Sequence, residues 1–258
     1  MKKIIPLFSG SSGNCTYIRC DDEEILVDAG VSMKMIECAL NSINTGLSRI
    51  KAIFVTHEHT DHIKGVEAIS KAYGIPVYIN GASAQYAVQN GIFCETQKVI
   101  TEKNALDSVS LDGIHADIFK TPHDSCGSVG YRFTFSDGSA LGYATDMGYI
   151  TKTVAEALFG CETVILESNH DLQMLKNGPY PYYLKHRIMS DRGHLSNDAS
   201  ANLLPYLYEK GTKKVILAHL SEHNNTPRLA YETNTEALKK EGIGESEMKI
   251  TVAMKSVI

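Results

Sequence analysis

Short apolar runs of high β-propensity recur along the chain and alternate with stretches of helical periodicity. Runs rich in Val, Ile, Leu, Phe and Tyr, bounded by polar residues or Gly, predict β-strands at 16–19, 25–27, 52–55, 77–79, 116–120, 129–135, 140–143, 163–166 and 215–217. Helical spacing with Gly, Ser or Thr near its ends predicts helices at 62–73, 82–89, 151–158, 197–209 and 234–240. The alternation continues along the whole chain, with no internal repeat.

A dense set of metal-ligand residues follows one of these strands. The apolar run 53–55 leads directly into Thr56-His57-Glu58-His59-Thr60-Asp61-His62. Imidazole and carboxylate groups are ligands that divalent first-row metals accept. If the loop keeps the strand's alternation, His57 and His59 project to one side and share an ion, whereas the consecutive Asp61 and His62 reach a second. The spacing therefore favours two metal ions.

Length and composition limit the class of protein. A chain of 258 residues with 43% hydrophobic content and no linker-like tract is expected to form one compact domain, 1–258. Six scattered cysteines without a Cys-x-x-Cys pair suit reduced thiols in the cytoplasm. The basic N-terminus has an apolar run too short for an export signal, and no stretch approaches a membrane span. A net charge of -5 argues against a broad basic coat, so any nucleic-acid contact should be local.

The His-x-His-x-Asp-His spacing resembles the signature of the metallo-β-lactamase superfamily. The resemblance implies an α/β fold, an αββα sandwich of two mixed β-sheets packed face to face with helices outside. It also implies three ligands further along the chain, each after a strand: His123, a bridging Asp146, and His219. The implied set places two divalent ions, Zn or Mn with Fe as a further option, on His57, His59, His123, Asp61, His62, His219 and the shared Asp146.

Another feature of the same family is a strand that ends in Asp-x-Gly, here Asp28-Ala29-Gly30. The resemblance implies that Asp28 holds a ligand imidazole by its free N–H. The alternative is an ordinary turn after a strand.

The implied reaction is hydrolysis by a metal-bridging hydroxide, with Asp61, His194 and Glu167 as catalytic residues. The segment 192–197 resembles one carried by nuclease branches of the superfamily, where His194 donates a proton to the leaving oxygen. Glu167 ends a strand and is expected to orient His194. The alternative reading is that Ser196 or Asn197 caps a helix and His194 is incidental.

The segment 176–192 mixes basic residues with tyrosines, which suits a groove that follows a nucleic-acid backbone, although a mixed basic surface loop is as common. We interpret it as a lid, because the 73 positions between Asp146 and His219 leave no room for the β-CASP insertion of RNA-cleaving relatives. Candidate substrate-binding residues in and beyond this segment are Ser11, Ser12, Asn14, Asn169, Lys185, Arg187, Arg192, Ser196 and His223. Plain readings stay open for them: a Gly/Ser turn at 11–14, a helix cap at 169–171, and a surface residue at 223.

Motifs spread over nearly the whole chain, at 8–15, 167–171, 177–181, 190–197 and 218–224, resemble the YycJ/WalJ-like branch, small cytoplasmic proteins of bacteria. That resemblance implies a 5'-to-3' DNA exonuclease that acts on DNA ends with Mn or Zn. The alternatives are a small-molecule ester, thioester or lactone hydrolase of the same fold, an RNA-processing nuclease, and a binding protein without catalysis.

Overall fold

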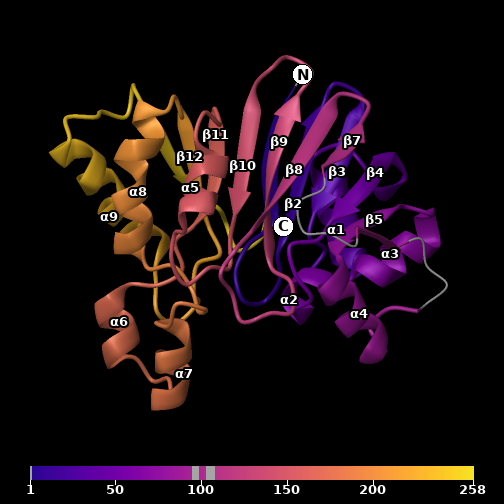
Figure 1. Ribbon diagram of the computed structural model, residues 1–258, viewed down its shortest axis with the longest axis horizontal. Helices are drawn as coiled ribbons and strands as arrows, with labels where there is room; N and C mark the ends of the chain where they lie inside the picture. Colours follow the sequence, from indigo (N-terminus) through magenta and orange to yellow (C-terminus); the bar gives the residue numbers. More distant parts are fainter. Residues whose placement is uncertain (1, 95–98, 103–107) are drawn as a thin grey trace. The chain divides into compact units, whose positions relative to one another are not determined.

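The structure is a computed structural model that describes residues 2–94, 99–102 and 108–258. Contacts group the chain into two compact units (Figure 1). The first unit comprises Met1–His115, Ser125–Val129 and Met254–Ile258, and the second comprises Ala116–Asp124 and Gly130–Ala253. The sequence-based expectation of one domain over 1–258 stays a prediction.

The first sheet has six strands in the order β1-β2-β3-β4-β5-β6. Neighbours are antiparallel from β1 to β3 and parallel from β3 to β6, so the sheet is mixed. Its strands are β1 (Lys3–Phe8), β2 (Cys15–Cys20), β3 (Glu23–Val27), β4 (Ile50–Phe54), β5 (Val77–Asn80) and β6 (Val99–Glu102).

Amphipathic helices cover this sheet's apolar residues. In α1 (Met33–Ser42) the buried Ile36, Ala39 and Leu40 recur at helical spacing, and the Ser32 side chain caps the first turn. These residues join one core with Leu26 and Ile53 of the strands. The remaining helices of the unit are η1 (Leu47–Arg49), α2 (Thr60–Ile63), α3 (Val66–Tyr73) and α4 (Gly81–Gln89).

The second sheet has seven strands in the order β13-β12-β11-β10-β9-β8-β7 and is also mixed. From β10 to β13 all neighbours are parallel, and β10 and β11 are buried along their whole length. Its strands are β7 (Val109–Leu111), β8 (Ile114–Lys120), β9 (Val129–Phe135), β10 (Ala140–Ala144), β11 (Thr163–Glu167), β12 (Lys214–Ala218) and β13 (Lys249–Val252).

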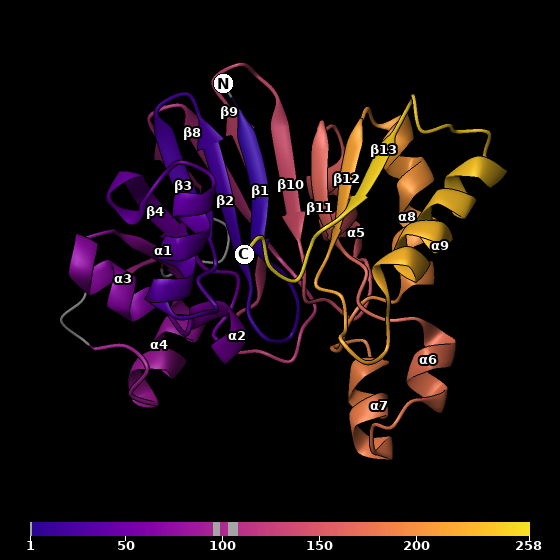
Figure 2. The same cartoon turned by 180° about the vertical axis from the view of Figure 1, so that it is seen from behind.

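Helices α8 (Asn197–Glu209) and α9 (Pro227–Lys240) lie side by side in the second unit, as both ribbon views show (Figures 1 and 2). Together with α5 (Lys152–Leu158) they bury Val154, Leu204 and Leu238 in one core with the strands. Two shorter helices, α6 (Leu172–Asn177) and α7 (Tyr182–Ile188), stand apart from α8 and α9 in both views.

All nine predicted strands are confirmed with small shifts of their ends, whereas β1, β6, β7 and β13 were missed. Pro6 lies within β1. Because β1 is at the edge of its sheet, a residue without an N–H is tolerated there. The α/β class, with two mixed sheets and helices, is confirmed.

Two helix predictions and the interpretation of one loop need correction. The helix expected at 62–73 is two helices, because Gly65 turns the chain: its N–H donates to the Ala29 carbonyl at 2.7 Å, and a Cβ there would lie 2.3 Å from the Val31 carbonyl oxygen. The last helix begins at Pro227 rather than 234, behind a Thr226 cap. The segment 176–192, expected to be a loop, contains α7 and the end of α6.

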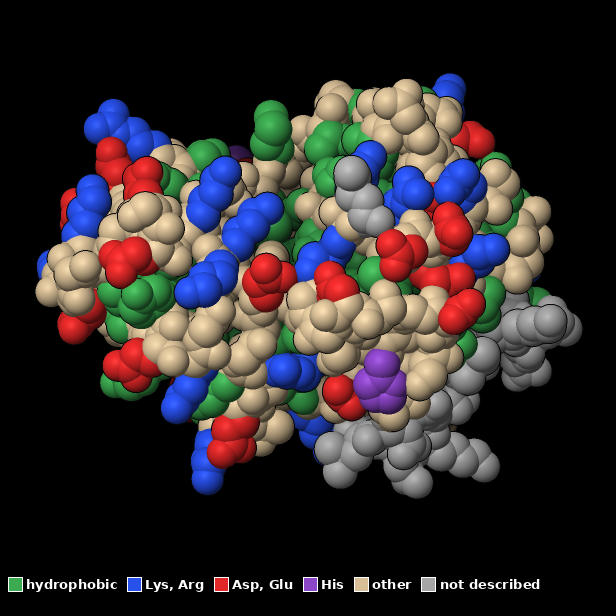
Figure 3. Space-filling model, turned by 90° about the horizontal axis from the view of Figure 1, so that it is seen from above, with side chains coloured by type: hydrophobic (Ala, Val, Ile, Leu, Met, Phe, Trp, Pro, Cys, Tyr) green, Lys and Arg blue, Asp and Glu red, His purple; other side chains and the backbone are tan. Residues whose placement is uncertain are grey.

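Lys and Arg side chains are interspersed with Asp and Glu on the face that Figure 3 shows, which fits the net charge of -5. Within the described part of the chain, no helix combines the length and apolar character that a membrane crossing requires.

Candidate metal centre

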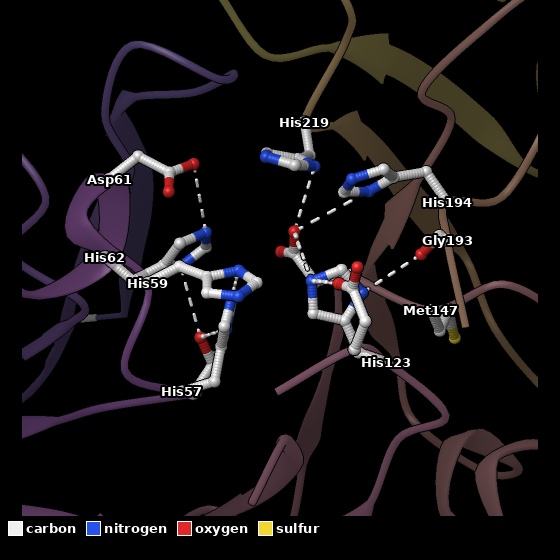
Figure 4. A network of polar contacts seen from close by, with 12 residues as sticks. His57, His59, Asp61, His62, His123, Met147, Gly193, His194 and His219 are labelled. Atoms are coloured by element: carbon white, nitrogen blue, oxygen red, sulfur yellow. Dashed lines mark hydrogen bonds and ion pairs between the residues drawn. The ribbon is translucent and has the colours of Figure 1, made fainter. Parts of the chain in front are cut away.

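The loop after β4 directs three imidazoles and a carboxylate from one short segment. β4 ends at Phe54 and the four-residue helix α2 begins at Thr60. His57 and His59 therefore lie on the connecting loop, and Asp61 and His62 lie in α2. The Nε2 atom of His57 lies 2.9 Å from Nδ1 of His59, so these two ring nitrogens converge (Figure 4). The two rings thus lie close together, and their sharing of one ion stays a prediction.

A buried carboxylate fixes the ring of His62. Asp28 Oδ2 lies 2.8 Å from His62 Nδ1, and Thr56 donates to the same carboxylate through its backbone N–H at 2.8 Å. Burial raises the pKa of Asp28, and the contacts with His62 and Thr56 oppose that rise. Because the Nδ1–H of His62 is used in this way, its Nε2 is the atom left to act as a ligand. The contact expected of Asp28 is present.

Asn14 links the N-terminal loop to the same place. Its amide group lies 3.1 Å from His62 Nε2 and 3.4 Å from Asp61 Oδ2, and its side-chain oxygen accepts from the N–H of Gly10. The side-chain nitrogen of Asn14 therefore lies beside two proposed ligand atoms, His62 Nε2 and Asp61 Oδ2. Asn14 is buried, whereas Ser11 and Ser12 before it are exposed, so the three residues do not form one surface.

Gly30 explains the glycine of the Asp-x-Gly sequence. A Cβ on Gly30 would lie 1.6 Å from the carbonyl oxygen of Asp61 and 2.7 Å from the backbone N of Asn14. The backbone of the ligand loop thus packs directly on Gly30, and only a residue without a side chain fits.

Two of the proposed ligands in the second unit stand after parallel strands. Asp146 follows β10 and His219 follows β12, and both have a left-handed backbone, with φ of 57°. Asp28, after β3, has φ of 61°. Non-glycine residues in this region are strained and often belong to functional sites.

Glu167, the last residue of β11, binds two imidazoles at once. Its Oε1 lies 2.7 Å from His194 Nδ1 and 3.0 Å from His219 Nδ1, while its Oε2 accepts from the backbone N–H groups of Met147 at 2.9 Å and Leu195 at 3.2 Å. Burial acts to raise the pKa of this carboxyl, but the two histidines outweigh it and hold the pKa far below its ordinary value. Glu167 is therefore an anion that both histidines face with Nδ1.

One donor atom from each of Asp146, Glu167, His194 and His219 lies within 4.8 Å of the others. The Asp146 Oδ1 atom is 3.3 Å from His219 Nδ1 and 3.7 Å from His194 Nδ1. Two buried carboxylates thus share a small space with two imidazoles, an arrangement that a cation stabilises.

His123 is oriented by the backbone of the segment around His194. Its Nδ1 donates to the carbonyl oxygen of Gly193 at 3.0 Å, which leaves Nε2 as its ligand atom (Figure 4). Burial lowers the pKa of His123, and the nearby Asp146 opposes that effect. A buried neutral imidazole with a fixed tautomer is the form that binds divalent metals.

The donor chemistry of both sets fits divalent metal ions. In each unit a ring nitrogen of a histidine is held by a protein oxygen, as in His62, His123 and His219, and carboxylates lie beside these rings. Imidazole and carboxylate together suit Zn, Mn or Fe. The assignment of the seven predicted ligands to two ions stays a prediction.

The substrate-binding candidates have intramolecular partners in the structure. Asn169 is buried and donates to the His219 carbonyl at 2.8 Å, and Ser196 caps α8. Lys185 donates to the Lys176 carbonyl, and His223 is exposed with its ring against Tyr180. Their roles toward a substrate stay predictions.

The two arginines of that group both reach the loop that carries His123. Arg187 binds the Asp124 carboxylate through Nε at 2.5 Å and Nη2 at 3.0 Å. Arg192 donates to the His123 carbonyl from two nitrogens, at 3.3 and 3.4 Å.

Sequence reasoning missed three contributors: Thr56, Gly193, and the contact of Glu167 with His219. Thr56 directly precedes His57 and Gly193 directly precedes His194, so their positions in the motifs could have indicated a role in the site. Nothing in the chain order indicates that Glu167 serves a second histidine, because that contact depends on the pairing of β11 with β12.

Comparison with known proteins gives consistent matches. A family model described as a beta-lactamase superfamily domain matches residues 23–220. The exodeoxyribonuclease YycJ of Bacillus anthracis is 35% identical over 243 residues, 93% of this chain and 90% of the relative. The exodeoxyribonuclease WalJ of Streptococcus pneumoniae serotype 2 is 36% identical over 242 residues, 92% of this chain and 88% of the relative.

A solved structure has the same fold. The metallo-beta-lactamase fold protein YhfI from Bacillus subtilis superposes with a TM-score of 0.74 at 15% identity, covering 99% of this chain and 97% of that protein. At this identity the likeness concerns the fold alone.

Proposed function

This chain belongs to the beta-lactamase superfamily, and from that premise we propose that it is a metal-dependent exodeoxyribonuclease that degrades DNA from the 5' end. Similarity over 93% of the chain to a relative named as an exodeoxyribonuclease supports the substrate class. The contact of 2.7 Å between Glu167 and His194 is the observation that carries the mechanism. The protein is proposed to act as a single domain in the cytoplasm.

The ligand set follows the family pattern. His57, His59 and His123 would hold one ion and Asp61, His62 and His219 the other, with Asp146 shared between them. When bound, two divalent ions lower the pKa of water toward neutrality and polarise a phosphoryl oxygen. Zn and Mn are the proposed ions, with Fe as a third option.

His194 is proposed to protonate the leaving oxygen. Because Glu167 engages its Nδ1, the proton available for transfer is on Nε2. His194 is half-buried, so its ring is more accessible than those of His123 and His219. The contact with Glu167 holds the ring in one orientation.

The decisive experiment incubates 5'- and 3'-end-labelled duplex DNA with the purified protein and Mn or Zn, in parallel with RNA and a thioester. We expect nucleotide release from the 5' end of DNA, and its loss in His59→Ala and Asp146→Asn proteins. His194→Ala should lower kcat by about 100- to 10,000-fold, as for a missing general acid. His115→Ala is the matched control, since His115 lies on β8 and contacts Ser110.

Other outcomes would replace the proposal. Thioester turnover that persists in His194→Ala would identify a small-molecule hydrolase, and preferential loss of RNA would identify an RNA-processing enzyme. Metal binding without any hydrolysis would identify a binding protein.

A further inference from the structure

Helix α7 presents two adjacent tyrosines to solvent. Tyr182 is 77% exposed and Tyr183 is 75% exposed, more than Tyr206 on α8 at 60%. The ring of Tyr182 lies against that of His186 one turn later, with centroids 4.3 Å apart and planes at 57°. This contact gives the surface a second ring and restricts the motion of Tyr182.

The charges of the same helix are all basic. The sequence of α7 is YYLKHRI, with Lys185, His186 and Arg187 in its last turn and no acidic residue. The chain as a whole carries a net charge of -5, so this helix departs from the rest of the sequence. Aromatic rings beside basic groups are what single-stranded nucleic acids require: stacking for the bases and cations for the phosphates.

The helix is fastened to the segment that carries His194. The backbone N–H of His194 donates to the Ile188 carbonyl at 3.0 Å. A Cβ on Gly193 would lie 2.2 Å from the carbonyl oxygens of both Arg187 and Ile188, so the end of α7 packs closely on that backbone.

A second attachment joins α7 to the loop of His123. Arg187 binds both carboxylate oxygens of Asp124, and the N–H of Asp124 donates to the Arg192 carbonyl at 3.0 Å. Arg187 is therefore occupied with positioning, and Lys185 donates to the Lys176 carbonyl at 2.7 Å. The exposed rings of Tyr182 and Tyr183 are then the groups of this helix that we expect to meet a ligand.

We propose that Tyr182 and Tyr183 form a stacking platform for the unpaired bases of single-stranded DNA. The inference rests on the proposed nuclease function and specifies the form of its substrate: the strand beside the cleavage point is unpaired when bound. Each ring stacks on a base, Tyr182 together with His186, and the attachments of α7 hold the stacked strand in a fixed position relative to His123 and His194. The platform acts in binding, so its loss raises KM rather than lowering kcat.

The absence of tryptophan from this chain gives a direct test. In Tyr182→Trp the introduced side chain is the only indole, and its fluorescence should be quenched when single-stranded oligodeoxynucleotide is added in EDTA. Tyr206→Trp, with the indole on α8, is the matched control and should show no quenching. Unchanged fluorescence of Tyr182→Trp at saturating DNA would overturn the proposal.

Variants of the neighbouring ring measure the contribution of stacking. On the Tyr182→Trp background, Tyr183→Ala should weaken binding about 10-fold, because stacking contributes about 1–3 kcal/mol per base, whereas Tyr183→Phe should bind normally. Equal affinity of the Ala and Phe variants for DNA would overturn the proposal. In hydrolysis, Tyr183→Ala should raise KM for an oligodeoxynucleotide by a similar factor.

Further arms separate the proposal from its rivals. Quenching by RNA alone or by blunt duplex DNA alone would assign the surface to a different ligand. Quenching on raising the protein concentration, without any DNA, would assign it to a second copy of the chain. Because binding is measured in EDTA, quenching by single-stranded DNA in a protein without nuclease activity would refute the proposed function and leave the platform standing. Nuclease activity without quenching would refute the stacking platform and leave the proposed function standing.

Discussion

Gly30 shows how strongly one residue controls the loop of proposed ligands. Since a Cβ there would overlap the Asp61 carbonyl at 1.6 Å, Gly30→Ala must displace the backbone of Asp61. We expect a loss of about 1–3 kcal/mol in the free energy of unfolding, as for other overpacked sites, together with reduced metal content. Urea unfolding and elemental analysis measure the two effects. Gly46→Ala is the control, because φ is -158° and the added methyl would meet only Asn41 at 3.9 Å; equal effects of both variants would contradict the explanation.

A carboxylate far from the ligands gives a pH-dependent prediction. Glu24 accepts from Arg49 Nε at 2.6 Å and from Thr45 Oγ1 at 2.5 Å; burial acts to raise its pKa, but Thr45, Arg49 and Tyr17 lower it below the ordinary value. A lowered pKa in the folded state means that the ionised form stabilises the fold above pH about 4.3, and that this contribution is lost as the pH falls through the folded-state pKa.

Glu24→Gln should therefore destabilise the protein by about 1–2 kcal/mol at pH 7, and the difference from wild type should shrink below pH about 4. Urea unfolding at pH 7 and at pH about 3.5 tests this. The neighbouring, half-buried Glu23→Gln serves as control. If wild type and Glu24→Gln differed in unfolding free energy by the same amount at both pH values, the charge of Glu24 would not be the source of the stabilisation.

Among single residues, the sequence predicted those that stand close together in one motif. His57, His59, Asp61 and His62 stand in one motif, so their convergence follows from the loop alone. The contact of Glu167 with both His194 and His219 depends on non-local strand pairing, and the role of Gly30 depends on a backbone more than thirty positions away. Neither kind of contact has a signature in the order of residues.

Among the elements, α8 tests two readings of Ser196. The structure places Ser196 at the N-cap, where its Oγ accepts from the N–H of Ala199 at 3.2 Å. Ser196→Ala should lower the free energy of unfolding by about 1 kcal/mol, as at other helix caps. Thr226→Ala at the start of α9 should cost a similar amount and is the matched control. If Ser196 also binds substrate, its variant alone will raise KM for DNA.

Strands rich in apolar residues were predictable, whereas the ten-residue helix α1 and the short helices α6 and α7 were missed. β11 contains the apolar run Val164-Ile165-Leu166, and β9 is rich in Val, Tyr and Phe, so their positions followed from the sequence with errors of one residue at most. α6 and α7 have six and seven residues, near prolines, and each buries a single side chain, Leu175 or Ile188. Such helices lack the apolar periodicity that a sequence pattern needs.

For the whole molecule, removal of metal should reduce stability as well as activity. The second unit buries the carboxylates of Asp146 and Glu167, and a bound cation would compensate this charge in the folded state only. Protein treated with EDTA should melt at a lower temperature than protein with Zn or Mn, and addition of Zn should restore the original value. Differential scanning calorimetry with parallel elemental analysis measures this, with Mg at equal ionic strength as control. Identical melting of metal-loaded and metal-free protein would contradict it.

Three of the proposed metal-site residues, Asp28, Asp146 and His219, have a left-handed backbone that glycine would adopt with less strain. A glycine at any of these positions would relieve backbone strain, but it would also remove the side chain that the proposed chemistry needs. Directed evolution for heat resistance alone would favour replacements there that abolish turnover, so a screen on this scaffold needs an activity filter in every round.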